Sequence, residues 1–280
     1  MKTQAELAAE QVAFWNGPGG KLWLEAYELT RRAVAPFSEA VLAAASVKAG
    51  ENVADIGCGT GETTAVLAKA VGPSGHVLGI DVSEPLIAAA RAQNLGNATF
   101  VLGDASSHPF EAHRLDLLFS RFGVMFFGDA EAAFKNMRRA LKPTGRLVFI
   151  CWRTLKENPW GLVPFQAAAP HLPPVERPGP EDPGQYAFGE RARVERILGV
   201  AGFVQPAFRQ VDHLIVLGKD AATATENVTR RGPLGRAMAG ATPEQAEAAR
   251  RSVLAALAAH EGPQGVALKG ACWLVTARAT

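Results

Sequence analysis

The stretch VADIGCGTGETT, residues 53–64, constrains the fold of this chain more than any other part of it. Apolar residues lead to Asp55, and Gly57, Gly59 and Gly61 then follow at alternate positions before a run of helix-forming residues. Glycine has no β-carbon, so the chain can turn sharply at these positions and a ligand can approach the backbone. A strand that leads through such a loop into a helix also points backbone N–H groups at that ligand. The stretch therefore predicts a strand–loop–helix unit that binds a small molecule.

The residues around this loop alternate between short apolar runs and helical segments. Strands that are apolar on both faces and are separated by helices are typical of a parallel sheet covered on two sides. The sequence therefore predicts an α/β fold. We expect strands at 52–56, 76–81, 98–102, 115–119, 145–151, 203–217 and 265–278, and helices at 62–71, 84–93, 129–141 and 190–200.

The remaining segments predict a cap on this core. Thr3 and Glu6 form a capping-box pair that begins a helix, and Thr242 and Gln245 form another, with Pro243 in its first turn. Eight prolines between residues 153 and 189 argue against a long regular element and predict a loop-rich insertion. We expect an N-terminal helical cap (1–50), a ligand-binding core (51–152), a proline-rich cap insertion (153–189), a continuation of the core (190–218), a helical insertion (219–263) and a last core strand (264–280).

Composition narrows the class of protein. The net charge of +2 over 280 residues gives no argument for a nucleic-acid partner, and the apolar runs are too short for stable membrane insertion. The N-terminal residues do not resemble a secretory signal. The cysteines at 58, 151 and 272 form no C-x-x-C pair, so we expect neither a disulfide framework nor a metal site. A cytoplasmic protein fits these observations best.

Acidic residues indicate which ligand the glycine loop would bind. Asp55, Asp81 and Asp104 lie at or near the ends of three successive predicted strands, and no Walker lysine is present. Glu62 stands where a dinucleotide loop would have its third glycine. These acids favour a ligand with several hydrogen-bond donors and a positive charge. S-adenosylmethionine, with an amino acid end, a sulfonium and a ribose diol, is such a ligand.

Five segments in sequence order resemble the motifs of the class I S-adenosylmethionine-dependent methyltransferases: VADIGCGTG, IDVS, LGDA, LDLLFSRFGVMFF and ALKPTGRLVF. They are similar to the bacterial small-molecule group that includes the ubiquinone/menaquinone C-methyltransferases. The resemblance covers residues 50–152 and implies a Rossmann-like, seven-stranded, mostly parallel sheet with an antiparallel last strand, helices on both faces and a helical and loop cap. Thr144 departs from the family's usual glycine, and the segment between the last two strands is unusually long.

The resemblance also assigns a role to individual residues around S-adenosylmethionine, whose product would be S-adenosylhomocysteine. It implies that Asp55, Gly57, Cys58, Gly59 and Gly61 hold the methionine part; that Asp81 accepts the ribose hydroxyls with Val82 beside the adenine; that Asp104 and Ala105 contact the adenine edge; and that Ser120, Arg121 and Phe122 lie near the methionine and the substrate mouth.

Catalytic residues are harder to assign from the sequence. Methyl transfer from a sulfonium can be accelerated mainly by positioning the reactants and excluding water, and it needs a base only if the nucleophile must lose a proton. His108 and His113 are the nearest candidate bases, although a loop histidine is commonly just exposed to solvent. Arg121 is expected to face the pocket and hold a carboxylate or phenolate, or to form a salt bridge with the cap.

Aromatic residues gather in the predicted cap segments. Such residues either pack the cap on the core or line an apolar pocket for an aromatic or lipid-like acceptor. The bend over 15–20 is expected to close over the cofactor. Trp15, Trp23, Phe122, Trp152 and Trp160 are the predicted substrate-pocket residues.

We therefore expect methyl transfer to a small aromatic or apolar acceptor. The alternatives are a nicotinamide-dependent oxidoreductase and a non-catalytic module that binds S-adenosylmethionine. The sequence leaves open whether carbon, oxygen or nitrogen accepts the methyl group, and it leaves the oligomeric state open.

Overall fold

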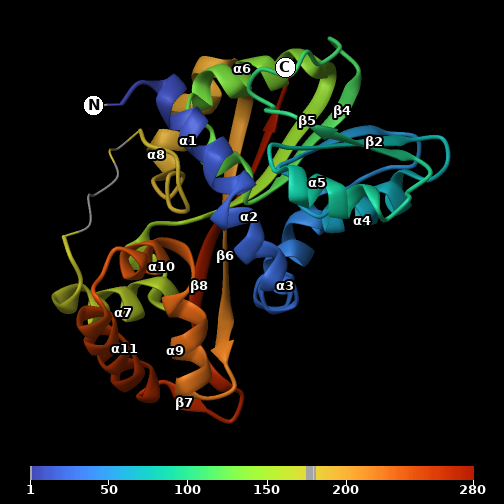
Figure 1. Ribbon diagram of the computed structural model, residues 1–280. Coiled ribbons are helices and arrows are strands. Elements are labelled where there is room, and N and C mark those ends of the chain that lie inside the picture. Colours follow the sequence, from blue (N-terminus) through green and yellow to red (C-terminus); the bar gives the residue numbers. More distant parts are fainter. Residues whose placement is uncertain (1, 175–178, 180) are drawn as a thin grey trace.

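One twisted sheet organises the chain, as the computed structural model shows for residues 2–174, 179 and 181–280 (Figure 1). Its strand order is β3-β2-β1-β4-β5-β8-β6, and the short β7 pairs only with β8. The strands are β1 (Asn52–Ile56), β2 (His76–Asp81), β3 (Ala98–Leu102), β4 (Leu115–Arg121), β5 (Leu141–Trp152), β6 (Val204–Gly218), β7 (Glu261–Gly262) and β8 (Gly265–Arg278).

The pairing of the strands confirms the predicted α/β class. Strands β1 to β5 are parallel to one another, whereas β8 runs antiparallel between β5 and β6. Seven strands thus form the predicted sheet with its antiparallel last strand, and the two-residue β7 is an addition. In the parallel register Asp55 lies beside Gly79 of β2 and Phe119 of β4. The carboxyl ends of the central strands therefore meet at one edge.

Helices cover both faces of the sheet (Figure 1). Helices α3, α4 and α5 pack on one face, and α6 and α8 pack on the other. The helices are α1 (Gln4–Asn16), α2 (Pro18–Glu25), α3 (Tyr27–Ala45), α4 (Glu62–Val71), α5 (Glu84–Arg91), α6 (Ala130–Ala140), α7 (Pro159–Ala168), α8 (Arg191–Ala201), α9 (Ala221–Thr229), α10 (Gly232–Ala239) and α11 (Pro243–Ala258).

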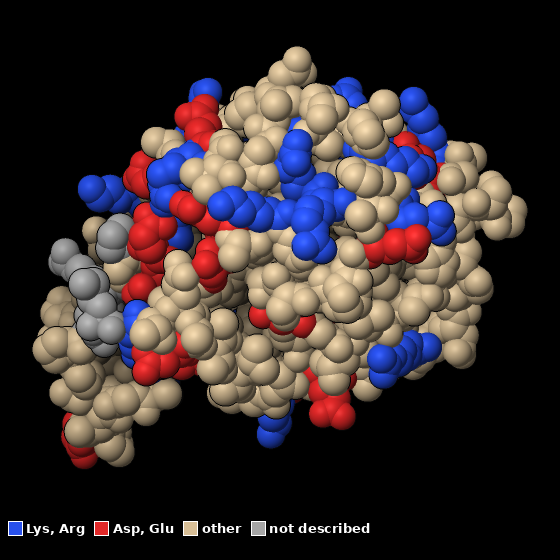
Figure 2. All heavy atoms as spheres, turned by 90° about the horizontal axis from the view of Figure 1, so that it is seen from above, with Lys and Arg blue, Asp and Glu red and all other residues tan. Residues whose placement is uncertain are grey.

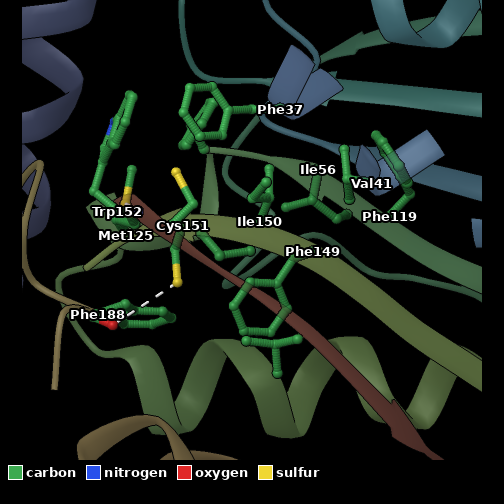
Figure 3. Close-up of a cluster of buried hydrophobic side chains, with 14 of the residues drawn as sticks. Phe37, Val41, Ile56, Phe119, Met125, Phe149, Ile150, Cys151, Trp152 and Phe188 are labelled. Carbon is green, nitrogen blue, oxygen red and sulfur yellow. Dashed lines mark hydrogen bonds between the residues drawn. The ribbon is translucent and has the colours of Figure 1, made fainter. Parts of the chain in front are cut away.

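Alternate residues of β5 divide the core between these two layers (Figure 3). Phe149 points toward α6, where its ring centroid lies 5.9 Å from that of Phe134. Trp152 points to the opposite face, where it lies 5.4 Å from Phe37 of α3. Because successive side chains of a strand point to opposite faces, an apolar run such as LVFIC can serve both layers at once.

The far ends of β6 and β8 carry a second helical layer, formed by α7, α9, α10 and α11 (Figure 1). The capping box of Thr242 and Gln245 begins α11 as predicted. The loop-rich prediction for 153–189 was wrong in one respect, because α7 forms there. Pro159 occupies the first turn of α7, where a missing N–H costs nothing, and Pro164 is accommodated inside it. Residues 175–178 and 180 of this insertion lie outside the described part of the chain.

Charged residues of both signs cover the surface. On the face seen in Figure 2, Lys and Arg side chains form a band with Asp and Glu beside it. Many of these charges are paired, as Lys142 is with Asp116 at 2.8 Å. Among the described residues no helix is both long enough and apolar enough to span a bilayer.

Candidate functional site

The glycine loop lies between β1 and α4, at the edge where the carboxyl ends of the parallel strands meet. Gly57, Gly59 and Gly61 have φ values of +68°, +55° and +82°, in the left-handed region that favours glycine. A β-carbon on Gly57 would lie 2.7 Å from the Cα of Gly123, and one on Gly61 would lie 2.9 Å from Phe100. These two glycines are therefore required by the packing of the protein itself.

Gly59 differs from the other two glycines of the loop. A β-carbon there would meet no described atom within 4 Å, although Gly59 lines the main cavity. Its backbone N–H donates to Oδ2 of Asp81 at 2.9 Å. The protein therefore leaves open space in front of Gly59, as a loop that lets a ligand approach its backbone must do.

Asp55 lies fully buried beneath this loop. Its Oδ2 accepts hydrogen bonds from the hydroxyls of Thr63 and Thr64, each at 2.7 Å, whereas Oδ1 has no partner among the described atoms. Burial raises the pKa of the carboxyl to about 6, against the opposing effects of the two hydroxyls and of Arg121. The fold thus keeps one acceptor atom of a buried acid unsatisfied next to the glycine loop.

Asp81 and Asp104 lie at the ends of the two strands beyond β1. The carboxylate of Asp81 accepts from the backbone N–H groups of Gly59 and Ser83, each at 2.9 Å, and burial raises its pKa. Asp104 accepts from the N–H of Ser106 at 2.7 Å. Both carboxylates line the cavity and are oriented by backbone donors, so they are preorganised acceptors for the hydroxyl and amino groups of a nucleoside.

Arg121 is paired within the core rather than free in the pocket. Its Nη1 donates to Glu62 at 2.8 Å and to Ser38 of α3 at 2.9 Å, and the Arg121 side chain is 11% exposed. The predicted salt bridge with the cap was wrong in its partner: Arg121 pairs with Glu62, the first residue of α4 in the core, and reaches the N-terminal segment only through the hydrogen bond to Ser38. Glu62 is turned toward Arg121, so its charge is compensated at the helix N-terminus.

One cavity of about 390 Å³ adjoins the loop and extends under the cap. Most of the predicted site residues line it, whereas Asp55, Gly61 and Ser120 do not. The hydroxyl of Ser120 is used inside the fold, since it donates to the carbonyl of Ile56 at 2.7 Å. The predicted residues that line the cavity are Trp15, Trp23, Gly57, Cys58, Gly59, Asp81, Val82, Asp104, Ala105, Arg121, Phe122, Trp152 and Trp160.

The five predicted substrate-pocket aromatics surround one part of this cavity. Phe122 and Trp152 are stacked, with ring centroids 4.7 Å apart, and Trp160 lies 5.0 Å from Trp152. Trp15 and Trp23 contact each other edge to face at 6.1 Å. These rings give the cavity apolar walls of the kind that bind a flat or apolar molecule.

The corner between α1 and α2 closes the cavity on the side where Asp81 lies. The Asn16 amide donates to the carbonyl of Val82 at 2.8 Å and accepts from the N–H of Glu84 at 2.9 Å. The hydroxyl of Ser83 donates to the carbonyl of Trp15 at 2.8 Å. The bend over 15–20 is therefore held against the residues that follow Asp81.

Neither candidate histidine lines the cavity. His113 precedes β4, so it lies at the amino end of the parallel strands, where its Nδ1 is 3.1 Å from the carbonyl of Leu141. Its position before a strand could have shown this from the sequence, because a loop before a parallel strand lies at the edge opposite the strand's carboxyl end. His108 packs edge to face on Phe110, with ring centroids 4.6 Å apart.

The sequence interpretation missed several residues that line the cavity. Tyr186 comes from the proline-rich insertion and is partly buried, and desolvation raises the pKa of its phenol. Arg231 and Arg236 come from the second helical layer. The sequence of these two cap segments shows only where apolar residues fall. That spacing does not predict which polar side chains point into the cavity. Within the described residues no group of three or more His, Cys, Asp or Glu side chains could hold a metal ion.

Comparison with known proteins relates the segment around the glycine loop to a known family. Residues 53–145 match the family model described as a methyltransferase domain. The chain is 39% identical over 110 residues to the demethylmenaquinone methyltransferase of Staphylococcus carnosus, a match that covers 39% of this chain and 46% of that protein. The chain thus spans about half the length of the curated relatives it matches.

Solved structures share the fold over most of the chain. The YcgJ protein of Bacillus subtilis superimposes with a TM-score of 0.56 at 14% identity, covering 86% of this chain and 97% of that one. A chain in the complex between the Haloferax volcanii Trm112 methyltransferase activator and a methyltransferase gives 0.55 at 18% identity, covering 96% and 97%. At these identities the likeness shows the fold alone.

Replacing Asp55 by Asn will change how stability depends on pH. Above pH 6 the buried carboxylate is ionised and opposes folding, and this cost disappears as the pH falls through the folded-state pKa of about 6 toward the usual 3.8. We expect the free energy of unfolding of Asp55→Asn, relative to that of the native chain, to be about 2 kcal/mol larger at pH 8 than at pH 4. Denaturant titrations at both pH values measure it.

The control for this variant is Asp116→Asn. Hydrogen bonds from Lys142 and from the N–H of Asn52 outweigh desolvation and hold the pKa of Asp116 below its usual value, so this carboxylate stays ionised in the folded state at both pH values and the substitution should lose nearly the same stability at pH 8 and pH 4. A pH-independent difference between Asp55→Asn and the native chain would contradict the burial argument.

Replacing Gly59 by Ala will weaken cofactor binding more than it weakens the fold. The left-handed backbone makes Ala cost about 1–2 kcal/mol of stability, and the new methyl group occupies the open space before the loop. Gly50 is the control, since its φ is +82° and a β-carbon there would make only an ordinary contact, 3.5 Å from Oγ of Ser74, outside the cavity. We expect Gly59→Ala and Gly50→Ala both to lose stability through their positive φ, and only Gly59→Ala to lose affinity for S-adenosylhomocysteine, by about tenfold or more. Equal calorimetric affinities for the two variants would refute this.

Proposed function

We propose that this chain, which belongs to the class I S-adenosylmethionine-dependent methyltransferases, methylates a small acceptor that is aromatic or apolar. The single observation that carries the proposal is the continuity of the cavity. The same space is lined by the glycine loop with Asp81 and Asp104 and by the stacked rings of Phe122 and Trp152. A cofactor with polar groups and an acceptor with an apolar body would therefore meet in one enclosure.

The residues present fit the cofactor. Gly59 faces open space, Asp81 and Asp104 offer oriented carboxylates to the cavity, and Asp55 keeps an unsatisfied buried oxygen beneath the loop. S-adenosylmethionine supplies a methyl group on a sulfonium that needs no further activation. We infer that Asp81 accepts the ribose hydroxyls and that Asp104 with Ala105 contacts the adenine.

The chain's own residues would accelerate transfer by positioning and enclosure. The described cavity wall contains no histidine or lysine, and burial raises the pKa values of Tyr186 and Cys58, so neither is an effective base at neutral pH. Holding two reactants in line can by itself supply a large part of the rate acceleration. Trp15 and Trp152 would exclude water from the space between cofactor and acceptor. The acceptor would then be a molecule whose nucleophilic atom ionises readily, such as a phenol or an enol.

The relative named for demethylmenaquinone supports an acceptor of the quinone type for this chain. The apolar cavity wall is consistent with such a ring. The alternative of a nicotinamide-dependent oxidoreductase has no support in the family match. A module that binds the cofactor without turnover would show binding but no transfer.

Calorimetric titration of the full chain with S-adenosylhomocysteine, and separately with NAD and NADP, tests the cofactor. We expect micromolar binding of S-adenosylhomocysteine alone, because the acids suit hydroxyl, amino and ammonium donors and no cation is free at the loop to hold a pyrophosphate. Binding of a nicotinamide nucleotide alone would overturn the proposal. Screening of phenolic and quinone-like acceptors with S-adenosylmethionine then distinguishes an enzyme from a binding module.

Asp81→Ala tests the placement of the ribose. Two hydrogen bonds to a charged acceptor are worth about 1.5–3 kcal/mol each, so we expect the affinity for S-adenosylhomocysteine to fall at least about a hundredfold. Asp220→Ala is the control, because that carboxylate also accepts a backbone N–H, from Thr223 at 2.7 Å, without lining the cavity. Unchanged affinity in a folded Asp81→Ala variant would exclude this placement.

A further inference from the structure

The part of the cavity under the helical layer carries positive charge that no residue in the described part of the chain neutralises. Arg231 lies immediately before α10 and Arg236 lies in its last turn, and both line the cavity. The guanidinium of Arg231 has no hydrogen bond or ion pair with any described residue. Arg236 has only an aromatic contact, in which its Cζ lies 5.6 Å from the ring centroid of Phe14.

Acidic partners lie close to Arg231, as the ion pairs of its neighbour Arg230 show. Arg230 lies 3.7 Å from Glu226 and 3.9 Å from Glu25, whereas Arg231, the next residue, turns to the cavity wall instead. Arg231 is partly buried and Arg236 is exposed; desolvation lowers the pKa of each guanidinium, but an arginine stays charged throughout the physiological range. A partly desolvated charge without a partner is unfavourable in the empty protein.

The charges of the cavity wall are also segregated. Its described carboxylates are Asp81 and Asp104, both at the nucleotide end, and its third arginine, Arg121, is already paired with Glu62. The acceptor end therefore combines aromatic walls with two guanidinium groups and no acid. Its other polar side chains are neutral, among them Gln185 and Asn227.

From this arrangement we propose that the methyl acceptor is an amphipathic anion, with an apolar or aromatic body against Trp152 and Trp160 and a carboxylate or phosphate bound by Arg231, with Arg236 beside it. The planar guanidinium fork matches two oxygens of either anion, which makes arginine well suited to this role. The inference rests on the proposed function, because it names the class of acceptor for that same cavity.

A pair of dyes that differ by one charged group tests the proposal without the acceptor being known. Anilinonaphthalene sulfonate is an anion, and N-phenylnaphthylamine has the same rings without the sulfonate. Fluorescence titrations would use the full chain saturated with S-adenosylhomocysteine. We expect the anion to bind about tenfold or more tightly than the neutral dye.

Variants of three arginines then locate the effect. Arg231→Gln should lower the affinity for the anionic dye about tenfold and leave the neutral dye unchanged, and Arg236→Gln should have a smaller effect of the same kind. Arg230→Gln is the matched control and should change neither dye, since Arg230 does not line the cavity. The side chain of Arg231 bonds to none of the described residues, so its substitution should not lower the unfolding temperature.

Competition separates the two anions. Displacement of the anionic dye by naphthoate or by naphthyl phosphate, more strongly than by naphthalene methanol, supports the proposal, and the better competitor identifies the group. Equal affinity of the native chain for both dyes would overturn it, and so would a loss of both dyes in Arg231→Gln.

The same samples distinguish this proposal from the one on which it rests. Failure of the native chain to bind S-adenosylhomocysteine would refute the methyltransferase proposal, and the dyes can then be compared without it. Binding of S-adenosylhomocysteine together with no preference for the anionic dye would refute only the anionic acceptor.

Discussion

The carboxylate of Asp55, buried at the end of the central strand, determines the geometry of the loop around it. A buried charge is unfavourable unless donors compensate for it, and here the hydroxyls of Thr63 and Thr64 do so from the first turn of α4. Those two bonds tie the start of the helix to the end of β1. The chain must then turn within a few residues, so the glycines adopt left-handed backbone angles, and Gly59 is left facing the cavity.

The cavity combines parts of the chain with different constraints. Its nucleotide end is built by strands whose register is fixed by the sheet, so Asp81 and Asp104 are positioned by the same hydrogen bonds that hold the fold. Its acceptor end is built by the cap and by the helical layer on β6 and β8, which supply Trp160, Arg231 and Arg236. Under the proposed function, substitutions in the helical layer would alter the choice of acceptor without disturbing Asp81 and Asp104, because those carboxylates accept from the N–H groups of Gly59, Ser83 and Ser106, which lie outside that layer.

The core could be predicted from the sequence because its signal is local. Alternation of apolar runs and helices located the parallel strands, and the terminal strand over 265–278 was found at its observed bounds. Pairings over long sequence separations were not accessible: Glu62 and Arg121 are 59 residues apart, and only the folded chain shows that they meet. Helix α7 was missed because proline frequency does not show that Pro159 falls in a first turn. The inward orientation of Arg231 likewise depends on packing between helices.

The corner at Trp15 links the two ends of the cavity. Its carbonyl accepts from Ser83, two residues beyond Asp81, while its ring lies 5.3 Å from Phe126 and close to Trp23. The backbone of Trp15 is thus bonded to a residue near Asp81, while its ring packs with Phe126 and Trp23 in the aromatic part of the cavity. Because α1 buries none of its own residues, these few bonds and ring contacts hold the corner in place. The corner that closes the cavity therefore depends on bonds to residues 82–84. Under the proposed function, in which Asp81 binds the ribose, order at this segment and exclusion of water from the cavity would reinforce each other.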